Sequence, residues 1–408
     1  MLCIDQPSLC AIDPEADVKR IMFVTGHYYR SNRRGGIHWL AKAFHRAGWD
    51  VLFFTSGLSY FSRIIKDHRF QYPVMAEANR ILRIEERFSS FVWFTPWHPV
   101  KFQFKLANRL AAPLFARYGN LSLFEAENAI RRMDVIMIEG GAGLVLVDRL
   151  KRINPSARFV YRVSDDLEAL NISPVIIEAE RRYAPDFDLI TAPSSRLLGK
   201  FRHLSNTAIH PQGLAKELFD REHRNPYKDS SVPNLISIGN MIYDLDFLKR
   251  ASRIFPDWRF HIIGWLEKVP QNSNVIFYGE KPFEQAVAFM KYADIGLSPY
   301  QYRPGNEYLS DASHKMLQYT YCRLPVVAPN FVTDPSKPHV IGYEPGEDDS
   351  IRNALERAIA IEHETIDPSP VRTWDEIVQE MSAAIDTRFE IRKHEAHEKH
   401  EKHETRES

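Results

Sequence analysis

The sequence predicts an α/β protein with two doubly wound, mostly parallel sheets. Short apolar runs bounded by turn residues alternate with segments of helical length and periodicity. This alternation stops once, over residues 211–233, where the chain becomes polar and proline-bearing. The length of 408 residues is enough for two domains that each bury their own core. We therefore expect two Rossmann-like domains of similar size whose parallel sheets present their carboxyl ends to a central cleft.

The first half of the chain follows a βα order. Its expected elements are a strand at 20–26, a basic glycine-containing loop at 27–36, a helix at 37–48, a strand at 50–56, a strand–turn–helix unit at 134–150, a strand at 157–163, a helix through 176–184 and a strand at 188–194.

The second half repeats the pattern. Its expected elements are strands at 234–240, 258–265 and 274–280, helices at 246–255 and 283–293, a strand–loop–helix–strand unit at 294–330, a turn-rich segment, and helices from Ser350 to about Ile361 and from Trp374 to about Ile385. We divide the chain into an irregular arm at 1–18, an N-terminal domain at 19–215, a linker at 216–233, a C-terminal domain at 234–372, a C-terminal helix at 373–387 and a disordered, charged, His-rich tail at 388–408.

Composition excludes several classes of protein. Lysine plus arginine equals aspartate plus glutamate, 53 of each, so no global positive field would recruit nucleic acid. The three cysteines, Cys3, Cys10 and Cys322, are scattered and odd in number, which favours a reducing compartment over a disulfide framework. Charged residues interrupt every apolar stretch before 18 residues, and the first twenty residues lack the apolar core of a secretory signal. The sequence predicts a cytosolic protein without a membrane span.

The segment from Asp294 to Asn330 predicts an anion site. Its loop lies at the carboxyl end of a buried strand, where open α/β sheets bind ligands. A helix capped by Ser310 or Asp311 and continuing to about Cys322 would place Asp311, Lys315 and Gln318 on one face. The free N–H groups at such a helix start attract an anion, and the lysine adds a full charge. The alternative is a solvated helix face with an Asp–Lys pair.

Five motifs carry a resemblance to a known family: YRVSDDL at 161–167, IGNMIYDLDF at 238–247, VIFYGE at 275–280, GLSPY at 296–300 and YLSDASHKMLQY at 308–319. On these motifs the chain resembles the GT-B superfamily of sugar-nucleotide glycosyltransferases, and within it the xanthan-pathway, membrane-associated glucuronosyltransferase family (GumK). The similarity covers residues from about 20 to about 385, and the two ends depart from it.

The resemblance implies a GT-B fold that binds the nucleotide in the C-terminal domain and the acceptor in the N-terminal domain. It implies an inverting glycosyltransferase that moves glucuronate from UDP-glucuronate to a polyprenyl-diphosphate-linked oligosaccharide in exopolysaccharide biosynthesis. The alternatives are a GT-B transferase for another UDP-sugar, a UDP-sugar epimerase of the same two-domain plan, and a non-catalytic lipid-binding scaffold.

An inverting transfer needs a general base for the acceptor hydroxyl, and Asp165 is the predicted base. It directly follows the strand at 157–163 and matches the family's SD motif. The alternatives are a helix-capping role for Asp165, or Asp166 as the base.

The predicted UDP-sugar site combines the helix start with the family motifs. Its residues are Met241, Glu280, Lys281, Tyr300, Ser313, Lys315 and Gln318. Lys315 and the helix start would stabilise the leaving diphosphate, with Tyr300 donating a hydrogen bond. Core packing remains an alternative for Met241 and an ordinary strand-end aromatic for Tyr300. The candidates for binding the glucuronate carboxylate are Lys315, Lys281 and Arg303.

No metal site or cofactor is predicted. The strings Asp186-Phe-Asp188 and Asp244-Leu-Asp246 resemble metal-binding pairs, but helix capping is sufficient to explain them. The dinucleotide fingerprint G-x-G-x-x-G and the esterase elbow G-x-S-x-G are both absent from the sequence.

Two basic regions predict the acceptor and membrane contacts. The loop with Arg30, Arg33 and Arg34 either meets the acceptor's diphosphate or is solvated surface. Residues 87–120 contain no acidic residue and mix aromatic side chains with basic ones, and residues 58–70 are similar. The basic side chains that we expect at the membrane are Lys101, Lys105 and Arg109. We expect peripheral attachment to the cytoplasmic side of the inner membrane; the alternative is internal packing on the sheet.

Overall fold

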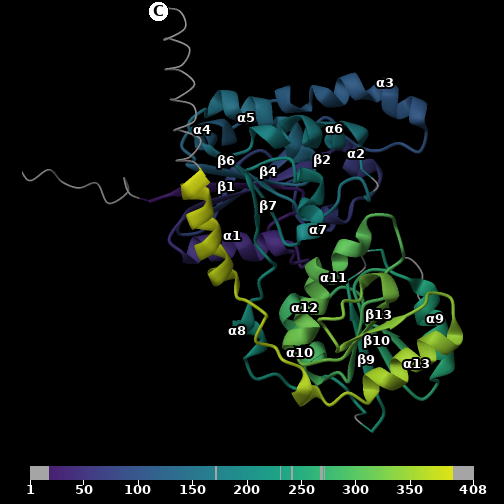
Figure 1. Cartoon of the computed structure of the whole chain (residues 1–408). Coiled ribbons are helices and arrows are strands. Elements are labelled where there is room, and N and C mark those ends of the chain that lie inside the picture. Colours follow the sequence, from purple (N-terminus) through teal and green to yellow (C-terminus); the bar gives the residue numbers. More distant parts are fainter. Residues whose placement is uncertain are drawn as a thin grey trace, which may run out of the picture.

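The structure is a computed structural model that describes residues 18–388, except Asn171, Ser230, Asn240, Met241, 267–269 and Gln271. Two α/β halves lie one above the other (Figure 1), each built on its own sheet. The expected α/β fold with two parallel-dominated sheets is confirmed.

The upper sheet has eight strands within the described residues, in the order β3-β4-β2-β1-β5-β6-β7-β8. These strands are β1 (Arg20–Thr25), β2 (Asp50–Ser59), β3 (Ile81–Glu85), β4 (Phe88–Thr95), β5 (Val135–Glu139), β6 (Arg158–Arg162), β7 (Leu189–Ala192) and β8 (Thr207–Ile209). All neighbours are parallel except the antiparallel pair β3–β4. The central strands are buried on both faces, which explains their nearly continuous apolar sequence.

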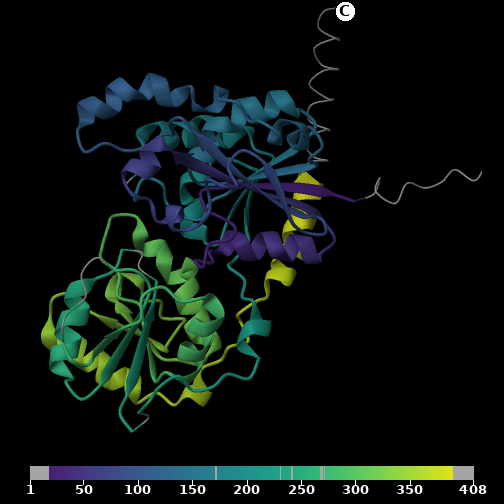
Figure 2. The same ribbon diagram turned by 180° about the vertical axis from the view of Figure 1, so that it is seen from behind.

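Helices cover both faces of this sheet. They are α1 (Gly36–Arg46), α2 (Tyr60–Ile64), α3 (Lys105–Ala116), α4 (Ala126–Ile130), α5 (Val147–Ile153), α6 (Pro174–Tyr183) and α7 (Ser195–Leu198), with short 3₁₀ turns η1 (His68–Gln71), η2 (Tyr118–Asn120), η3 (Ala142–Leu146), η4 (Ala184–Asp186) and η5 (Gly199–Phe201). Seen from behind, the purple helix α1 runs along the side of the upper sheet that faces the lower half (Figure 2).

The lower sheet has six parallel strands among the described residues, in the order β11-β10-β9-β12-β13-β14. These strands are β9 (Asn234–Ile238), β10 (Arg259–Ile263), β11 (Val275–Phe277), β12 (Ile295–Leu297), β13 (Val326–Pro329) and β14 (Val340–Tyr343). The helices are α8 (Lys216–Phe219), α9 (Leu245–Ile254), α10 (Phe283–Tyr292), α11 (Leu309–Ala312), α12 (His314–Tyr321) and α13 (Asp348–Ile359), with 3₁₀ turns η6 (Asn306–Tyr308), η7 (Asn330–Val332) and η8 (His363–Thr365).

Two predictions about this half were wrong. The segment after β13, expected to be turn-rich and without a strand of its own, supplies the edge strand β14. The single helix expected from Ser310 or Asp311 is broken, because Ser313 has an extended backbone with ψ 111°. The Ser313 hydroxyl accepts a hydrogen bond from Met316 N and so starts a new helix, α12. Asp311 consequently does not share a face with Lys315; it lies on α11, with its carboxylate 3.5 Å from Lys337 Nζ.

The C-terminal helix returns to the upper half. Its described part, residues 374–388, was expected as a helix from Trp374, and Figure 1 shows it in yellow beside the upper sheet. Lys19 pairs with Asp386 at 3.0 Å and Arg46 with Asp375 at 2.7 Å. Trp374 is buried against Gly213, where an added Cβ would lie 2.8 Å from the Trp374 backbone. The return of the chain to the upper half therefore connects the two halves by packing as well as by ion pairs.

Candidate active site

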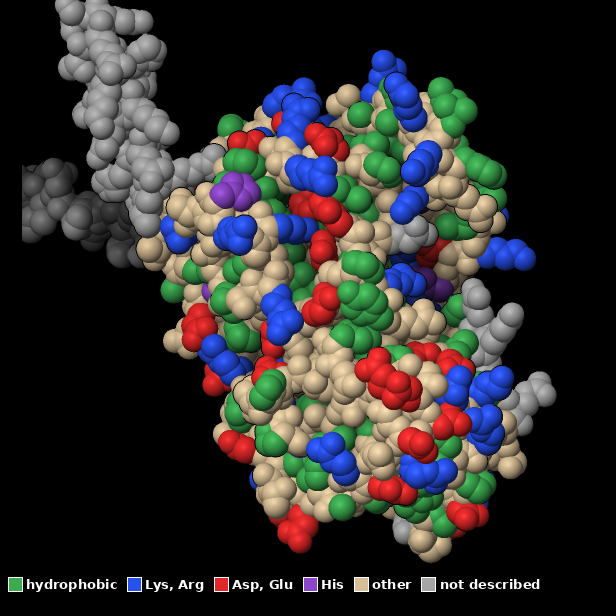
Figure 3. Space-filling view, turned by 45° about the vertical axis from the view of Figure 1, so that its right-hand side comes forward, with side chains coloured by type: hydrophobic (Ala, Val, Ile, Leu, Met, Phe, Trp, Pro, Cys, Tyr) green, Lys and Arg blue, Asp and Glu red, His purple; other side chains and the backbone are tan. Residues whose placement is uncertain are grey.

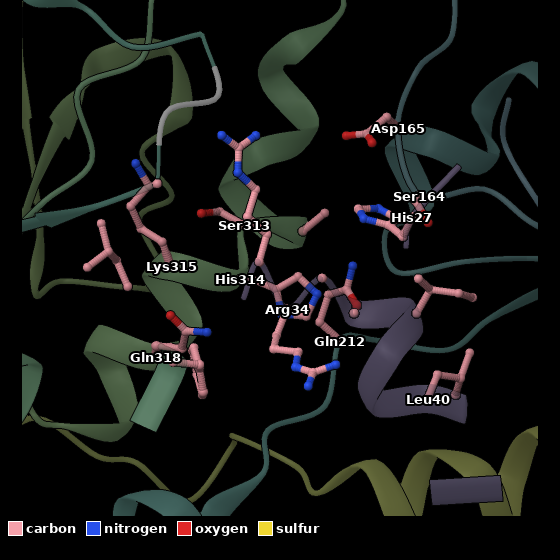
Figure 4. A pocket seen from close by; sticks show the side chains of 18 of the residues that line it. His27, Arg34, Leu40, Ser164, Asp165, Gln212, Ser313, His314, Lys315 and Gln318 are labelled. Atoms are coloured by element: carbon pink, nitrogen blue, oxygen red, sulfur yellow. The ribbon is translucent and has the colours of Figure 1, made fainter. Parts of the chain in front are cut away.

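A cavity of about 410 Å³ lies where the carboxyl ends of the two sheets face each other (Figure 4). Its polar lining includes His27, Arg33, Arg34, Glu139, Arg162, Ser164, Asp165, Gln212, Glu280, Lys281, Tyr300, Tyr308, Ser313, His314, Lys315 and Gln318. Asp165 from the upper half and Lys315 from the lower half line the same space. A carboxylate from one half and a lysine from the other therefore face one cavity, in keeping with the central cleft expected from the sequence.

The lower half contributes a lysine without a counterion. Lys315 Nζ is buried, makes no hydrogen bond within the described part of the chain, and lies 4.6 Å from the centroid of the Tyr300 ring. Burial lowers the pKa of Lys315 to about 7, because a charged ammonium is poorly solvated there. Tyr300 is itself buried, and its hydroxyl lies 2.7 Å from Ser313 Oγ at the start of α12. The helix start, the hydroxyls and the lysine form a receptor for an anion.

The loop after β11 closes the cavity on the other side. Glu280 and Lys281 both line it, as predicted from the motif VIFYGE. In this structure the Glu280 carboxylate accepts hydrogen bonds from Arg33 of the upper half and, at 3.2 Å, from Gln71 Nε2. Gln318, one helical turn after Lys315, also lines the cavity. The prediction for Met241 lies outside the described residues.

The carboxylate from the upper half is Asp165 rather than its neighbour. Asp165 follows β6, and its Oδ1 accepts a hydrogen bond of 2.6 Å from the Tyr308 hydroxyl, which belongs to the lower half. Burial raises the pKa of Asp165, and the Tyr308 hydrogen bond opposes that rise. Asp166 instead lies 3.4 Å from Lys200 Nζ and lines a separate cavity. The structure thus places only Asp165 of the two aspartates at the cavity shared with Lys315.

A second carboxylate of the upper half, Glu139, lines the same cavity and was missed by the sequence analysis. Glu139, at the end of β5, accepts hydrogen bonds from Thr25 Oγ1 at 2.5 Å and from Ser164 Oγ at 2.7 Å. His27 Nε2 lies 3.8 Å from the same carboxylate. Each of these residues sits at or just after the carboxyl end of a strand expected from sequence. That position was the available signal, because parallel strands bring their carboxyl ends to one edge.

Not every predicted basic residue reaches the cavity. Arg34 lines it and donates a hydrogen bond to Tyr29 O, whereas Arg30 is held by Glu77 at 2.5 Å and lies outside the lining. Arg303 is exposed and also lies outside the lining, which removes it as a carboxylate ligand. Its side chain faces solvent although it lies between Tyr300 and Ser313 in the sequence.

Both Asp-x-Asp strings contain an aspartate with a structural contact. Asp244 caps α9 by accepting hydrogen bonds from Asp246 N and Phe247 N. Asp188 accepts one from Phe159 N at 2.6 Å. Among the described residues, no group of three or more His, Cys, Asp or Glu side chains is arranged to hold a metal ion. The contacts of Asp244 confirm helix capping, whereas Asp188 bonds to strand β6, so the expected helix cap was wrong for the string at 186–188.

A two-sheet α/β chain with an anion receptor facing a carboxylate across the inter-sheet cavity has the architecture of a GT-B glycosyltransferase. Solved structures share this fold. HepE from Anabaena, solved with UDP and glucose, gives a TM-score of 0.56 at 15% identity over 90% of this chain and 99% of that chain. The UDP-forming α,α-trehalose-phosphate synthase of Burkholderia xenovorans gives a TM-score of 0.56 at 10% identity over 90% and 100% of the two chains.

Within that class, the chain belongs to the GumK family of glucuronosyltransferases. It is 30% identical over 350 residues to UDP-glucuronate:glycolipid 2-beta-glucuronosyltransferase of Xanthomonas campestris pv. campestris, covering 85% of this chain and 86% of the relative. Residues 23–193 match the family model described as glucuronosyltransferase GumK, N-terminal domain. The resemblance drawn from the five motifs is confirmed.

Proposed function

We propose that this protein transfers glucuronate from UDP-glucuronate to a lipid-linked oligosaccharide, with inversion at the anomeric carbon, in exopolysaccharide biosynthesis. The observation that carries the proposal is the placement of Asp165 and Lys315 on opposite walls of one cavity. The name of the Xanthomonas relative supports the donor and the glycolipid acceptor.

The reaction is a single displacement. Asp165 removes the proton of the acceptor hydroxyl while the hydroxyl oxygen bonds to the anomeric carbon of the donor. The bond from that carbon to the β-phosphate oxygen breaks, and UDP leaves with the electron pair. Lys315 and the N–H groups at the start of α12 stabilise the negative charge that the diphosphate gains. The proton remains on Asp165 and passes to solvent after the product leaves.

The donor is identified by a panel of UDP-sugars offered with a lipid-diphosphate-linked oligosaccharide, with UDP release as the measurement. We expect UDP-glucuronate to give the highest kcat/KM. Release with another UDP-sugar only would indicate the transferase with a different donor. Interconversion of UDP-sugars without acceptor would indicate the epimerase, and no binding of UDP at all would indicate a non-catalytic scaffold.

We further propose that α3 and the adjoining loop lie on an anionic membrane surface. Phe104, Leu106, Leu110 and Leu114 are 74%, 67%, 73% and 41% exposed. Lys101, Lys105 and Arg109 lie on the same segment. Figure 3 shows hydrophobic and basic side chains together at the upper right of the molecule, the part that contains α3. Apolar side chains flanked by lysine and arginine are typical of interfacial helices.

The structure divides the basic segment that the sequence analysis treated as one. Residues 88–95 form the buried strand β4, paired with β2, so this part packs internally and the membrane interpretation was wrong for it. A second exposed apolar pair, Ile64 and Ile65, lies at the end of α2 and is 73% and 69% exposed. Within the described part of the chain no helix is long and apolar enough to cross a bilayer. Our proposal is peripheral attachment at the cytoplasmic face of the inner membrane.

Sedimentation with liposomes tests the attachment. We expect the protein to pellet with vesicles of anionic phospholipid, to stay in solution with neutral ones, and to be released by salt. The double variant Leu106→Asp/Leu110→Asp should lose binding, whereas Ile359→Asp on α13, an exposed apolar residue of the lower half, should retain it. Binding that is unaffected by both salt and the double variant would contradict this surface.

A further inference from the structure

Among the described residues, three buried nitrogen atoms without a hydrogen-bond partner belong to side chains that line the same cavity. They are Lys315 Nζ, Arg162 Nη2 and His314 Nε2. Buried polar groups in folded proteins are nearly always paired, so three unpaired donors around one space indicate a ligand with acceptor groups. The diphosphate of a UDP-sugar accounts for Lys315. It leaves Arg162 and His314 without a partner.

Arg162 is held in place by protein groups on one edge of its guanidinium. It is 2% exposed at the end of β6. Its Nη1 donates a hydrogen bond of 2.9 Å to His210 O and lies 3.4 Å from Thr191 Oγ1. These contacts fix the plane of the guanidinium and leave Nη2 free.

No ion pair neutralises Arg162 within the described part of the chain. Glu139 is the carboxylate that acts on it electrostatically, but hydroxyl groups already occupy the oxygens of Glu139. Burial lowers the pKa of Arg162 to about 10, so the side chain remains charged at neutral pH. The upper wall of the cavity therefore carries a buried positive charge that is not paired.

His314 approaches from the lower half. It is the first residue of α12 and directly precedes Lys315. Its ring stacks on Trp374 with centroids 5.8 Å apart, and a Cβ added at Gly36 would lie 2.5 Å from its Nε2. The ring is thus confined by both halves. Burial, with the charge of Arg162, lowers the pKa of His314 to about 4, which leaves a neutral imidazole with one N–H.

The chemistry of the two groups selects the ligand. A guanidinium edge matches the two oxygens of a carboxylate, and a neutral imidazole N–H can donate to the same anion. Because Arg162, His314 and Lys315 line one cavity, this second anion site shares that space with the diphosphate site. In a UDP-sugar the group bonded to the β-phosphate is the sugar itself, and in a uronate the sugar carries a carboxylate.

We propose that Arg162 and His314 form the subsite that binds the carboxylate of the donor sugar and so selects a uronate over a neutral hexose. This inference rests on the proposed function, since it assumes that a UDP-sugar occupies the cavity. A neutral hexose leaves both donors unpaired in a buried site, and such sites reject the analogue that lacks the acceptor. The sequence candidates Lys281 and Lys315 remain available to the phosphates.

Calorimetric titration of the full chain with UDP, UDP-glucose and UDP-glucuronate tests the subsite. For the wild-type protein we expect UDP-glucuronate to bind about ten- to a hundredfold more tightly than UDP-glucose, the usual effect of a hydrogen-bonded charged group. In Arg162→Met the two Kd values should become nearly equal, and in His314→Met the preference should fall. UDP should bind all variants as it binds the wild type. Arg303→Met, an arginine outside the cavity, should keep the full preference.

Two results overturn the inference. One is a folded Arg162→Met variant that keeps the wild-type preference for UDP-glucuronate. If that variant does not fold, because His210 O loses its partner, an unchanged preference in His314→Met overturns it instead. Failure of the proposed function gives a different result, which is seen in the wild-type protein before any variant is compared: the wild type then either does not bind UDP or shows no preference for UDP-glucuronate.

Discussion

The two halves of the molecule build their walls of the cavity in different ways. In the lower half, Tyr300, Ser313, Lys315 and Gln318 come from one continuous stretch of nineteen residues. In the upper half, His27, Glu139, Arg162 and Asp165 come from the ends of three strands, and 138 positions separate the first residue from the last. The residues of the lower wall are therefore close together in the sequence, whereas those of the upper wall are brought together by the order of the strands in the sheet.

The carboxylates of the upper wall and the lysine of the lower wall also differ in whether they have hydrogen-bond partners. The upper carboxylates are hydrogen-bonded: Glu139 to two hydroxyls and Asp165 to Tyr308. The lower lysine has no partner among the described residues. This difference agrees with different roles for the two residues, in which Asp165 of the upper wall is a positioned base and Lys315 of the lower wall binds an anion. The predictions below test these two roles, from the largest effect to the smallest.

Replacing the base should have the largest effect. Asp165→Asn keeps the shape of the side chain and removes its basicity, so we expect transfer to fall about 10²–10⁴-fold while UDP binding is retained. UDP release and calorimetry measure the two quantities. Asp166→Asn is the matched control, because Asp166 lines another cavity, and its effect should be small. The reverse order of effects would assign the base to Asp166.

Removing the positive charge of Lys315 should weaken the binding of the nucleotide. Lys315→Met keeps the packing on Tyr300 and deletes the ammonium, so UDP affinity should fall about ten- to a hundredfold, as for a lost charged hydrogen bond. Thermal shift and calorimetry check this. Lys337→Met removes a lysine that contacts α11 but does not line the cavity, and this variant should bind UDP normally. Equal affinities in the two variants would contradict the anion receptor.

The pH dependence of donor binding follows from the lowered pKa of Lys315, about 7. Below this pH the lysine is already charged. Above it, the bound diphosphate must raise the pKa again, so a proton is taken up and the affinity for UDP-glucuronate falls up to about tenfold per pH unit. Titrations at several pH values, in buffers of different ionisation enthalpy, measure both effects. Lys315→Met should abolish the proton uptake.

The hydrogen bond from Tyr308 of the lower half to Asp165 of the upper half should influence the pH at which kcat/KM falls on the acid side. The Tyr308 hydroxyl opposes the burial that raises the pKa of Asp165. In Tyr308→Phe this opposition is lost, so the fall of kcat/KM at low pH should begin at a higher pH, with little change at alkaline pH. The exposed Tyr302→Phe provides the control. Identical profiles for Tyr308→Phe and wild type would show that this hydrogen bond does not tune the base.

Metal removal should have no effect. Lys315 and the start of α12 supply the positive charge that a divalent ion provides in other transferases, and the aspartates of the Asp-x-Asp strings have structural contacts. Activity should be the same in EDTA and in excess Mg²⁺. A loss in EDTA that Mg²⁺ restores would require a metal ligand that the described residues do not reveal.

Most of the fold could be predicted because buried parallel strands and amphipathic helices leave a period in the sequence. The exceptions include strands β3, β4 and β8 and helix α3, which were not expected as elements, and two shorter features. Strand β14 has four residues and lies among turns, and the break at Ser313 depends on a backbone that the sequence allows but does not require. The buried strand β4 and the exposed helix α3 are both aromatic or apolar beside basic residues, so composition alone did not separate them.

The sequence by itself determined the alternating βα order, the strand ends that carry Asp165 and the local cluster around Lys315. These features depend on neighbouring residues, and family resemblance supports them. Only the tertiary structure decided which of two adjacent aspartates enters the cavity, that Arg30 and Arg303 stay outside it, and that Arg162 and His314 both line it. The reason is physical. The direction of a side chain at a strand end is set by its contacts with the rest of the sheet and with the opposite half, and the sequence around that residue does not specify these contacts.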